Sequence, residues 1–295
     1  MIVKKIEGYV FVLPAVLFMI ILIGYPLVYN VVLSFQDVDL SNLAGDRNAV
    51  GLDNYRELMN RDAFGLSVWN TLVYTVGSVF FQMVIGFLLA LYFSMKFRFA
   101  GYLRGIMMIS WLIPLTVTAL LFRFMMGSSE GIFNQMLMSV GIIDSAIPWL
   151  SSPEVALWSI IIANIWVGIP FNMLLLSTGL SSLPEDVFES ASLDGANGFQ
   201  KLVHITLPML KPVILIVMML GFIYTFKVFD LVFVMTGGGP LNSTEVLSTL
   251  AYRLSFNEFN FSLGAAAANV LFLILLVVSL VYLWIMQKDE GGDKI

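Results

Sequence analysis

Long runs of hydrophobic residues, separated by short polar segments, dominate the chain. Six runs are long enough to cross a membrane, which takes about 20 apolar residues in a helix. They fall at roughly residues 9–35, 68–95, 101–125, 154–178, 208–235 and 262–286. The pattern predicts an all-α polytopic membrane protein with six transmembrane helices. Four prolines within these runs should kink their helices: Pro14, Pro26, Pro114 and Pro170.

Composition supports a membrane protein and excludes several kinds of site. Hydrophobic residues make up 59% and charged residues 12%, whereas about a quarter of a soluble domain is charged. The chain has no cysteine and a single histidine, His204, which cannot build a metal site alone. A net charge of −5 gives no case for nucleic acid binding. The first apolar run has no small-residue cleavage site, so we interpret it as a retained span.

Lysine and arginine are unevenly distributed between the two sides of the predicted spans, and this bias sets orientation. One side carries Lys4, Lys5, Lys96, Arg98, Arg104, Lys201, Lys211, Lys288 and Lys294. The other side carries Arg47, Arg56, Arg61, Arg123 and Arg253. We therefore expect both termini and the 179–207 loop in the cytoplasm, and the loops 36–67, 126–153 and 236–261 outside.

This topology predicts a division into three parts. Residues 1–67 hold the first transmembrane helix and an outer loop, residues 68–286 form a five-helix core, and residues 287–295 form a short, disordered cytoplasmic tail. In the 126–153 loop, apolar residues recur at helical spacing and predict a helix on the outer surface. These residues are Ile132, Phe133, Met136, Leu137 and Val140.

The residue pattern of the cytoplasmic 179–207 loop predicts two short amphipathic helices. The first starts near Pro184, with acidic residues in its first turn, and Gly195 turns the chain after it. Asp194 is then placed to cap the second helix. The apolar faces are formed by Val187, Phe188 and Ala191 and by Phe199, Leu202 and Val203. These faces fit either an ordinary loop packed on its own helix ends or a knob that docks into a partner.

Three motifs carry a resemblance to a known family. Glu189-x-Ala191-x-x-Asp194-Gly195-Ala196, followed by Ile205-x-Leu207-Pro208, resembles the EAA motif of bacterial ABC importer permeases, with Ser190 where the family often has alanine. Asn164-x-Trp166-x-Gly168-x-Pro170 and Phe229-Asp230 with Met235-Thr-Gly-Gly-Gly-Pro240 resemble its carbohydrate branch, which carries sugars and glycerol phosphates. The subunit type is similar to the larger membrane subunit of the maltose transporter, and the likeness covers about residues 9–286.

The resemblance implies a type I ABC importer permease fold and inward transport of a carbohydrate, an oligosaccharide or related sugar, across the bacterial cytoplasmic (inner) membrane. It implies four partners besides membrane lipid: a second homologous permease, two ATPase subunits and an extracytoplasmic solute-binding protein. Coupling helices would span 184–205, and the ATPase-coupling residues would be Glu189, Ala191, Asp194, Gly195 and Ala196. No Gly-x-x-x-x-Gly-Lys-Ser/Thr sequence occurs. We therefore expect a non-catalytic subunit without a cofactor, whose partner ATPase uses ATP and Mg.

Polar and small residues within two spans are the candidates for substrate contact, because polar groups are costly inside a membrane. Helical spacing places Asn164, Val167, Gly168 and Phe171 on one stripe, and Gly221, Tyr224, Thr225 and Val228 on another. In similar sugar permeases the matching faces line the sugar site. Packing explains the same residues equally well, since glycine permits close helix approach and aromatic rings fill space. Asn269 in the sixth span is a weaker candidate.

Lys227 and Asp230 form a candidate outer gate, because they lie at i and i+3 near the outer end of the fifth span. A simple ion pair is the plainer interpretation. The alternative function is a secondary transporter or channel for a small polar solute. The sequence shows neither the central intramembrane carboxylate nor the two matched broken helices that are typical of such a carrier. A membrane enzyme fits least, since no paired carboxylates or histidine cluster occur at membrane depth.

Overall fold

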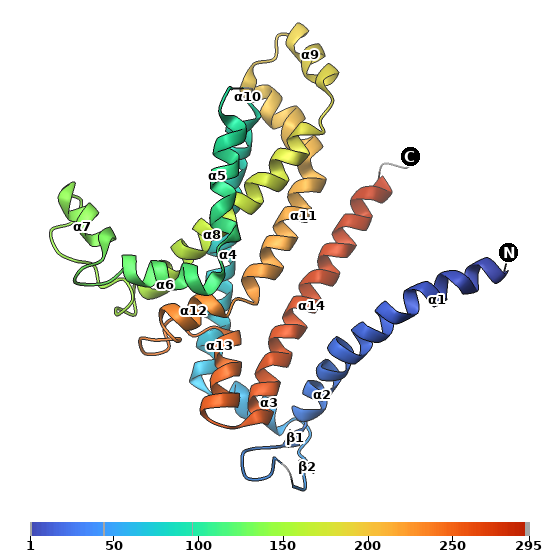
Figure 1. The fold of residues 1–295 in the computed structure, drawn as a ribbon, viewed down its shortest axis with the longest axis vertical. Helices are drawn as coiled ribbons and strands as arrows, with labels where there is room; N and C mark the ends of the chain where they lie inside the picture. Colours follow the sequence, from blue (N-terminus) through green and yellow to red (C-terminus); the bar gives the residue numbers. More distant parts are fainter. Residues whose placement is uncertain (1, 44, 96, 293–295) are drawn as a thin grey trace. The chain divides into compact units, whose positions relative to one another are not determined.

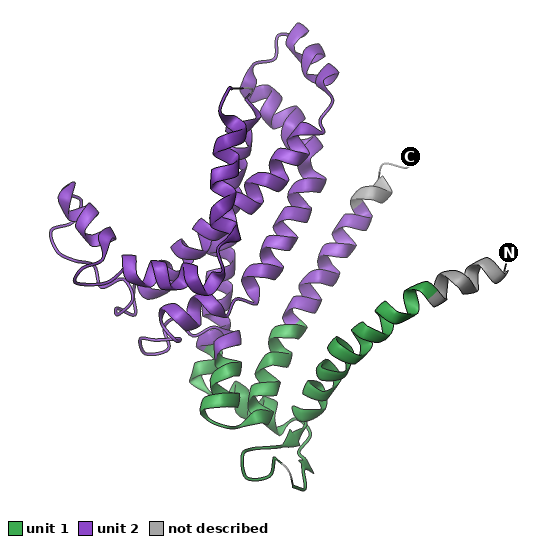
Figure 2. Cartoon of the chain, in the orientation of Figure 1, with its two compact units in different colours: residues 1–65, 250–273 green, residues 66–249, 274–295 purple. Residues whose placement is uncertain are grey.

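The computed structural model describes the backbone of residues 2–43, 45–95 and 97–292, and the side chains of residues 11–43, 45–95 and 97–288. Lys96 and Lys294, two residues of the orientation prediction, lie outside the described residues. The chain is mostly helical. It divides into two compact units: unit 1 has residues 1–65 and 250–273, and unit 2 has residues 66–249 and 274–295 (Figure 2).

Unit 1 contains the N-terminal span and the segments that pack at its end. Its elements are α1 (Ile2–Met19), the π-helical turn η1 (Ile20–Gly24), α2 (Tyr25–Leu33), β1 (Gln36–Asp37), β2 (Asn48–Ala49), α3 (Asp53–Met59) and the π-helical turn η3 (Arg253–Asn257). Within it α13 (Leu247–Tyr252) ends and α14 (Phe261–Gly292) begins. The strands pair antiparallel, with Gln36 opposite Ala49. The predicted outer loop 36–67 therefore contains a small hairpin and a helix.

Two kinds of contact hold unit 1 together. Leucines and alanines of α3, η3 and α14 form a buried cluster that includes Leu58, Leu254 and Leu263. A polar chain joins α2, α3 and α14. In it the Nδ2 of Asn30 donates to the Oδ1 of Asn269 at 2.7 Å, and the Nδ2 of Asn269 donates to the Tyr55 hydroxyl at 3.2 Å. The Tyr55 hydroxyl also lies 2.8 Å from Ser34 Oγ. Every link in this chain is hydrogen-bonded.

Unit 2 is built on long helices that contact one another along the chain order. Its elements are α4 (Asp62–Ser94), which starts at the end of unit 1, α5 (Ala100–Leu112), α6 (Leu115–Met125), α7 (Ile132–Ser139), α8 (Ala156–Ser181), α9 (Glu185–Leu193), α10 (Gly198–Lys201), the π-helical turn η2 (Leu202–Thr206), α11 (Leu207–Phe226) and α12 (Asp230–Met235). Helix α8 contacts both α5 and α11, and α12 packs on α6 and α8 (Figure 1).

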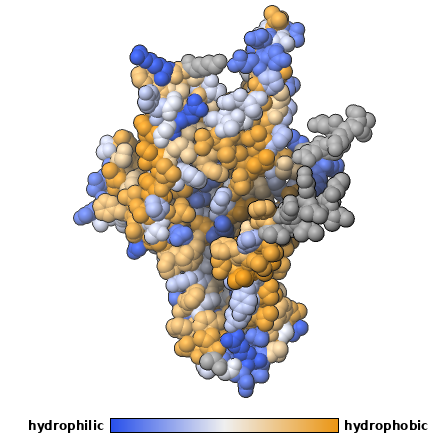
Figure 3. All heavy atoms as spheres, turned by 45° about the vertical axis from the view of Figure 1, so that its right-hand side comes forward, coloured by the Kyte–Doolittle hydropathy of each residue, from blue (hydrophilic) through white to orange (hydrophobic). Residues whose placement is uncertain are grey.

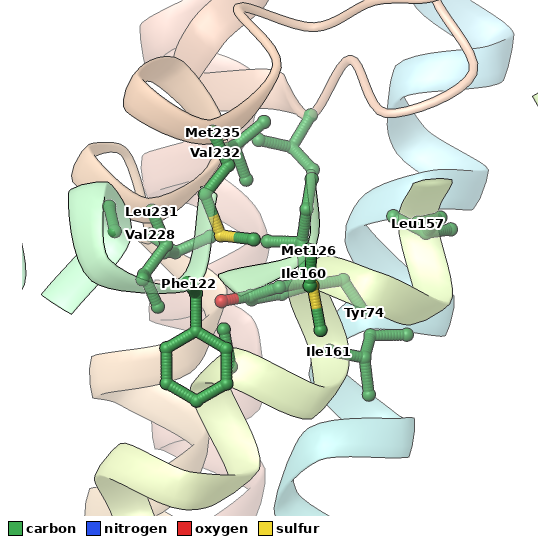
Figure 4. Packing of buried hydrophobic residues seen from close by; sticks show 13 residues of the cluster. Tyr74, Phe122, Met126, Leu157, Ile160, Ile161, Val228, Leu231, Val232 and Met235 are labelled. Atoms are coloured by element: carbon green, nitrogen blue, oxygen red, sulfur yellow. The ribbon is translucent and has the colours of Figure 1, made fainter. Parts of the chain in front are cut away.

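The largest apolar cluster of unit 2 fixes α12 against α4, α6 and α8 (Figure 4). Tyr74, Phe122, Ile160, Leu231 and Met235 are buried in it. In a membrane the lipid tails are as apolar as these side chains, so close packing rather than escape from water stabilises the cluster. This packing holds the short helix α12 at the end of α11, where a cavity opens.

Among the described residues, five helical stretches are long and apolar enough to cross a membrane: Phe11–Leu33, Asp62–Ser94, Ala156–Ser181, Gly198–Phe226 and Phe261–Lys288. The pair α5 and α6 gives a sixth, but it bends by 94° between Leu112 and Leu115. Hydrophobic residues cover much of the face seen in Figure 3, and hydrophilic residues gather at the end formed by α9. The surface composition is that of a membrane protein.

The kink predicted at Pro114 is confirmed, and it divides the predicted span 101–125 into two helices. Pro114 lacks an N–H and forces Ile113 into an extended conformation (φ −70°, ψ 130°), so α5 ends there and α6 starts in a new direction. The predicted span 208–235 is also interrupted: α11 ends at Phe226, and α12 begins at Asp230. Lys227 and Asp230 therefore do not share a helix.

Two smaller predictions can be compared with the structure. A helix on the 126–153 loop is confirmed as α7, which begins at Ile132 and ends at Ser139; its place on the membrane surface stays a prediction. The expected disordered tail is wrong for residues 287–292, because α14 continues to Gly292. Residues 293–295 lie outside the described residues.

Candidate functional site

A cavity of about 410 Å³ lies in unit 2, where several helices are interrupted. The α5–α6 break and the α11–α12 break both contribute residues to its wall. The lining residues are Gln82, Trp111, Ile113, Leu115, Asn164, Val167, Gly168, Phe171, Asn172, Gly221, Tyr224, Thr225, Lys227, Val228, Phe229 and Asp230. Its volume is in the range of small-molecule binding pockets.

The structure brings together both predicted stripes of substrate-contact residues. Asn164, Val167, Gly168 and Phe171 reach the cavity from α8, and Gly221, Tyr224, Thr225 and Val228 reach it from α11 and the residues just after that helix. Helical spacing alone placed each set on one face, and the contact between α8 and α11 turns the two faces toward a common space. Their contact with a substrate stays a prediction.

Aromatic rings form one part of the cavity wall. The rings of Trp111 and Phe171 stack, with centroids 5.5 Å apart and an angle of 16° between their planes. The ring of Phe171 also meets that of Tyr224 edge to face, with centroids 6.2 Å apart. The row thus joins α5, α8 and α11 and presents large apolar surfaces to the cavity. We call Trp111, Phe171 and Tyr224 the aromatic row.

Amide side chains form a second part of the wall. The Nε2 of Gln82 donates to the backbone oxygen of Asn164 at 2.8 Å, and the Nδ2 of Asn172 donates to the backbone oxygen of Gly168 at 2.8 Å. A Cβ on Gly168 would lie 2.2 Å from the Cδ of Gln82. Glycine at this position therefore allows the Gln82 amide to reach α8. The Nδ2 of Asn164 is buried and has no hydrogen-bond partner among the described residues.

One base and one acid, Lys227 and Asp230, stand in the cavity wall. Both side chains are exposed. The salt bridges found among the described residues do not include this pair, so the expectation of a simple ion pair is not met. The Nζ of Lys227 lies 5.3 Å from the centroid of the Tyr224 ring instead. Lys227 follows α11 as its C-cap residue, and Asp230 opens α12.

Several lining residues were missed at the level of sequence. They are Gln82, Trp111, Ile113, Leu115, Asn172 and Phe229. The polarity of Gln82 and Asn172 within apolar runs was a usable signal, since polar groups in spans are costly. Trp111, Ile113 and Leu115 gave no signal of their own, because they reach the cavity through the bend at Pro114.

The predicted coupling loop forms two short helices at one end of unit 2 (Figure 1). Gly195 has a φ of +81°, which strains any other residue, and turns the chain between α9 and α10. The prediction that Asp194 caps the second helix is wrong. Asn197 caps it: its Oδ1 accepts from the Gln200 N–H at 2.9 Å, and the Gln200 Oε1 accepts from the Asn197 N–H at 2.8 Å. Asp194 instead ends α9.

The predicted coupling loop presents both charged and apolar groups on its surface. Glu189 is exposed, and Ala191 and Ala196 are half-buried. The side chains of Leu193 and Phe199 are 90% and 74% exposed. The Nζ of Lys201 donates to Ser192 Oγ at 2.6 Å and ties α10 to α9, while Val187, Phe188 and Leu202 are half-buried.

Comparisons with known proteins agree with this architecture. A family model described as the binding-protein-dependent transport system inner membrane component matches residues 82–288. The trehalose/maltose transport system permease protein MalF of Thermococcus litoralis is 33% identical, over 94% of this chain and 92% of its own. The diacetylchitobiose uptake system permease protein DasB of Streptomyces coelicolor is 29% identical, over 97% of this chain and 88% of its own.

A solved structure also matches the fold. The crystal structure of a bacterial ABC transporter involved in the import of the acidic polysaccharide alginate contains a chain with a TM-score of 0.83 and 23% identity, and the match covers 97% of each chain. The all-α architecture is therefore that of a type I ABC importer permease. Together, the match over residues 82–288 and the 33% identity to MalF show that this chain belongs to the family of binding-protein-dependent transport system inner membrane components.

Proposed function

We propose that this permease moves a carbohydrate inward through the cavity of unit 2. The observation that carries the proposal is the composition of the cavity wall. An aromatic row offers flat surfaces for sugar rings, and the amides of Gln82 and Asn164 offer hydrogen-bonding groups for hydroxyls. The names of two relatives support a sugar, since one serves trehalose and maltose and the other diacetylchitobiose.

The burial of Asn164 supports the path through the cavity. An unpaired amide donor inside a protein costs about 1–3 kcal/mol, and such groups are rare unless a ligand or water satisfies them. A hydroxyl of a passing sugar would supply the acceptor that the described residues do not. The Gln82 amide, already held by the Asn164 backbone oxygen, would keep its remaining oxygen for a second hydroxyl.

The energy for transport would come from a partner. The coupling helices α9 and α10 would dock into an ATPase subunit, with Glu189 facing a basic residue and the exposed Leu193 and Phe199 entering its groove. A second homologous permease, two ATPase subunits and an extracytoplasmic solute-binding protein would complete the importer. The ATPase subunits would use ATP and Mg, and this chain would hydrolyse nothing.

The arrangement of lysine and arginine supports an orientation in the bacterial cytoplasmic membrane. Lys201 and Lys211 lie near the coupling loop, on the side where positive charges are enriched. Both termini and the loop would then be cytoplasmic. Family membership argues against the alternative function, a secondary transporter or channel.

The proposal is tested by reversing one charge on the coupling loop. Glu189→Lys should abolish ATP-driven sugar uptake in proteoliposomes that contain the complete importer, because a lysine would face the basic partner. Glu154→Lys, at another exposed glutamate outside the loop, is the matched control and should transport normally. Intact mass of the detergent-purified complex should show a second permease and two ATPase subunits. Normal uptake by Glu189→Lys, or a lone chain that transports, would contradict the proposal.

A further inference from the structure

Neither charged residue of the cavity wall, Lys227 or Asp230, belongs to an ion pair found among the described residues. Lys227 is the one base among the described residues of the wall, and the acid of the same wall, Asp230, is not within ion-pair distance of it. An ammonium group beside an apolar wall is stabilised by anionic or π partners. Among the described residues Lys227 has only the π partner, because its Nζ lies 5.3 Å from the centroid of Tyr224 and no salt bridge includes it.

The position of Lys227 relates it to the aromatic row. The rings run from Trp111 through Phe171 to Tyr224, and the ammonium group lies beside the last of them. A sugar ring lying against this row would place a group at its rim next to Lys227. An exocyclic carboxylate or phosphate there would replace a weak cation–π contact with a charge-assisted hydrogen bond.

Other donors in the wall fit the same kind of ligand. The buried Nδ2 of Asn164 has no acceptor among the described residues. Helix α6 starts at the cavity with Leu115 in the wall, and no side chain caps its first N–H groups. Uncapped N–H groups at a helix start favour acceptors and negative charge. The wall thus offers an amide donor and a cation to one ligand, and α6 starts beside them.

Asp230 does not cancel this preference. It is the first residue of α12, its side chain is exposed, and it forms no ion pair with Lys227 among the described residues. As an ionised carboxylate it only accepts hydrogen bonds, so it suits sugar hydroxyls. The acid and the base can therefore serve different groups of one molecule, the hydroxyls and the anionic substituent.

We propose that Lys227 binds an anionic substituent of the transported carbohydrate, so that the cavity takes an acidic sugar or a sugar phosphate in preference to a neutral sugar. This inference rests on the proposed carbohydrate transport and names the class of carbohydrate. The carboxylate of a uronate and the phosphate of a sugar ester share the chemistry that Lys227 recognises.

The test uses the complete importer in proteoliposomes, with its binding protein, and measures stimulation of ATP hydrolysis. The probes are neutral oligosaccharides of glucose, galactose, mannose and xylose, the corresponding uronate oligosaccharides, and hexose 6-phosphates. We expect the uronates or the phosphates to stimulate hydrolysis, and the two sets show which anion is carried. Lys227→Gln should lower stimulation by the anionic probe about tenfold or more, since a hydrogen bond to a charged group is lost.

Two variants isolate the charge. Lys227→Arg keeps a cation and should retain the preference for the anionic probe, and Asp230→Asn removes the opposing charge and should raise that preference. Stimulation by neutral sugars alone would overturn this inference and leave carbohydrate transport standing. Stimulation by no carbohydrate would overturn the proposed function itself. An anionic preference that Lys227→Gln leaves unchanged would overturn the role of Lys227.

Discussion

Two buried asparagines, Asn269 in unit 1 and Asn164 in unit 2, show how one residue type serves two purposes. Both lie in hydrophobic helices, and 5% and 7% of their surfaces are exposed. Asn269 accepts from Asn30 and donates to Tyr55, so its amide is tied into the packing of unit 1. The Nδ2 of Asn164 has no partner among the described residues, and the residue lines a cavity.

The difference teaches that hydrogen-bond satisfaction, rather than polarity within a span, separates a structural amide from a candidate ligand. A satisfied buried network makes the fold rigid and specific. A buried donor without a partner costs stability unless something transient satisfies it. The buried amide of unit 1 is therefore part of the packing, whereas the buried amide of the cavity wall in unit 2 has a donor free for a ligand.

The largest effects are expected when a glycine is replaced by alanine, at Gly264 in unit 1 and at Gly168 in unit 2. A Cβ on Gly264 would lie 1.8 Å from Ser255 Oγ and 2.9 Å from the backbone oxygen of Ala251, so Gly264→Ala should destabilise unit 1 by about 3 kcal/mol. The three atoms nearest to a Cβ on Gly168 all belong to the movable amide of Gln82, so Gly168→Ala should fold and lose transport.

Thermal unfolding in detergent, followed by uptake per folded complex, distinguishes these two variants. Gly105→Ala is the control, because a Cβ there has no neighbour within 4 Å. An unchanged midpoint for Gly264→Ala would show that unit 1 is not tightly packed, and it would break the comparison.

The next largest effects are opposite for the two asparagines: one variant should lose stability and the other should lose transport. Asn269→Ala removes the hydrogen bonds that its amide forms with Asn30 and Tyr55 and should cost about 1–3 kcal/mol of stability, with normal transport per folded complex. Asn164→Ala removes an unpaired donor, so stability should stay within about 0.5 kcal/mol and transport should fall about tenfold. Assembly of the complex is measured alongside. Loss of assembly in Asn164→Ala would favour a packing role for that residue.

A smaller effect is expected where one hydroxyl is removed. Tyr55→Phe deletes the group that bridges Ser34 and Asn269, and it should lower stability by about 1 kcal/mol. Tyr25→Phe, at an exposed tyrosine of α2, is the matched control. Equal unfolding midpoints for the two variants would mean that the polar chain contributes little to unit 1.

The smallest effect concerns the surface ion pairs of unit 1. The carboxylate of Glu258 forms ion pairs with the Nη1 of Arg61 at 2.8 Å and with the Nη1 of Arg253 at 2.7 Å. All three side chains are about one third exposed. Solvent screens such pairs, so Glu258→Gln should cost less than about 1 kcal/mol, and 1 M salt should remove the difference. A large loss of stability that salt does not change would contradict this and show that these ion pairs stabilise unit 1 strongly.

Much of the architecture could be predicted from the sequence, because the spans are long apolar runs and the helices α9 and α10 lie in a polar segment that turns at a glycine. The break at Pro114 could not, since a proline within an apolar run predicts a kink as readily as a 94° bend. Tertiary packing decides between the two outcomes.

The candidate site was partly predictable for a similar reason. Helical periodicity placed Asn164 and Tyr224 on their stripes, and the facing of α8 and α11 brought them together. Gln82 and Trp111 come from other helices, which no local pattern connects to this cavity. The sequence also cannot separate Asn164 from Asn269, because their difference lies in partners more than a hundred residues away in the chain.

The most direct test of the central claim is cysteine protection within the cavity. The chain has no cysteine, so Leu115→Cys in the cavity wall is the one maleimide target of this chain, and Asp144→Cys on an exposed loop is the control. The complete importer is labelled with and without the carbohydrate that stimulates its ATP hydrolysis most. We predict that the carbohydrate slows labelling of Leu115→Cys and leaves Asp144→Cys unchanged. Equal labelling rates at Leu115→Cys with and without the sugar would contradict passage through this cavity.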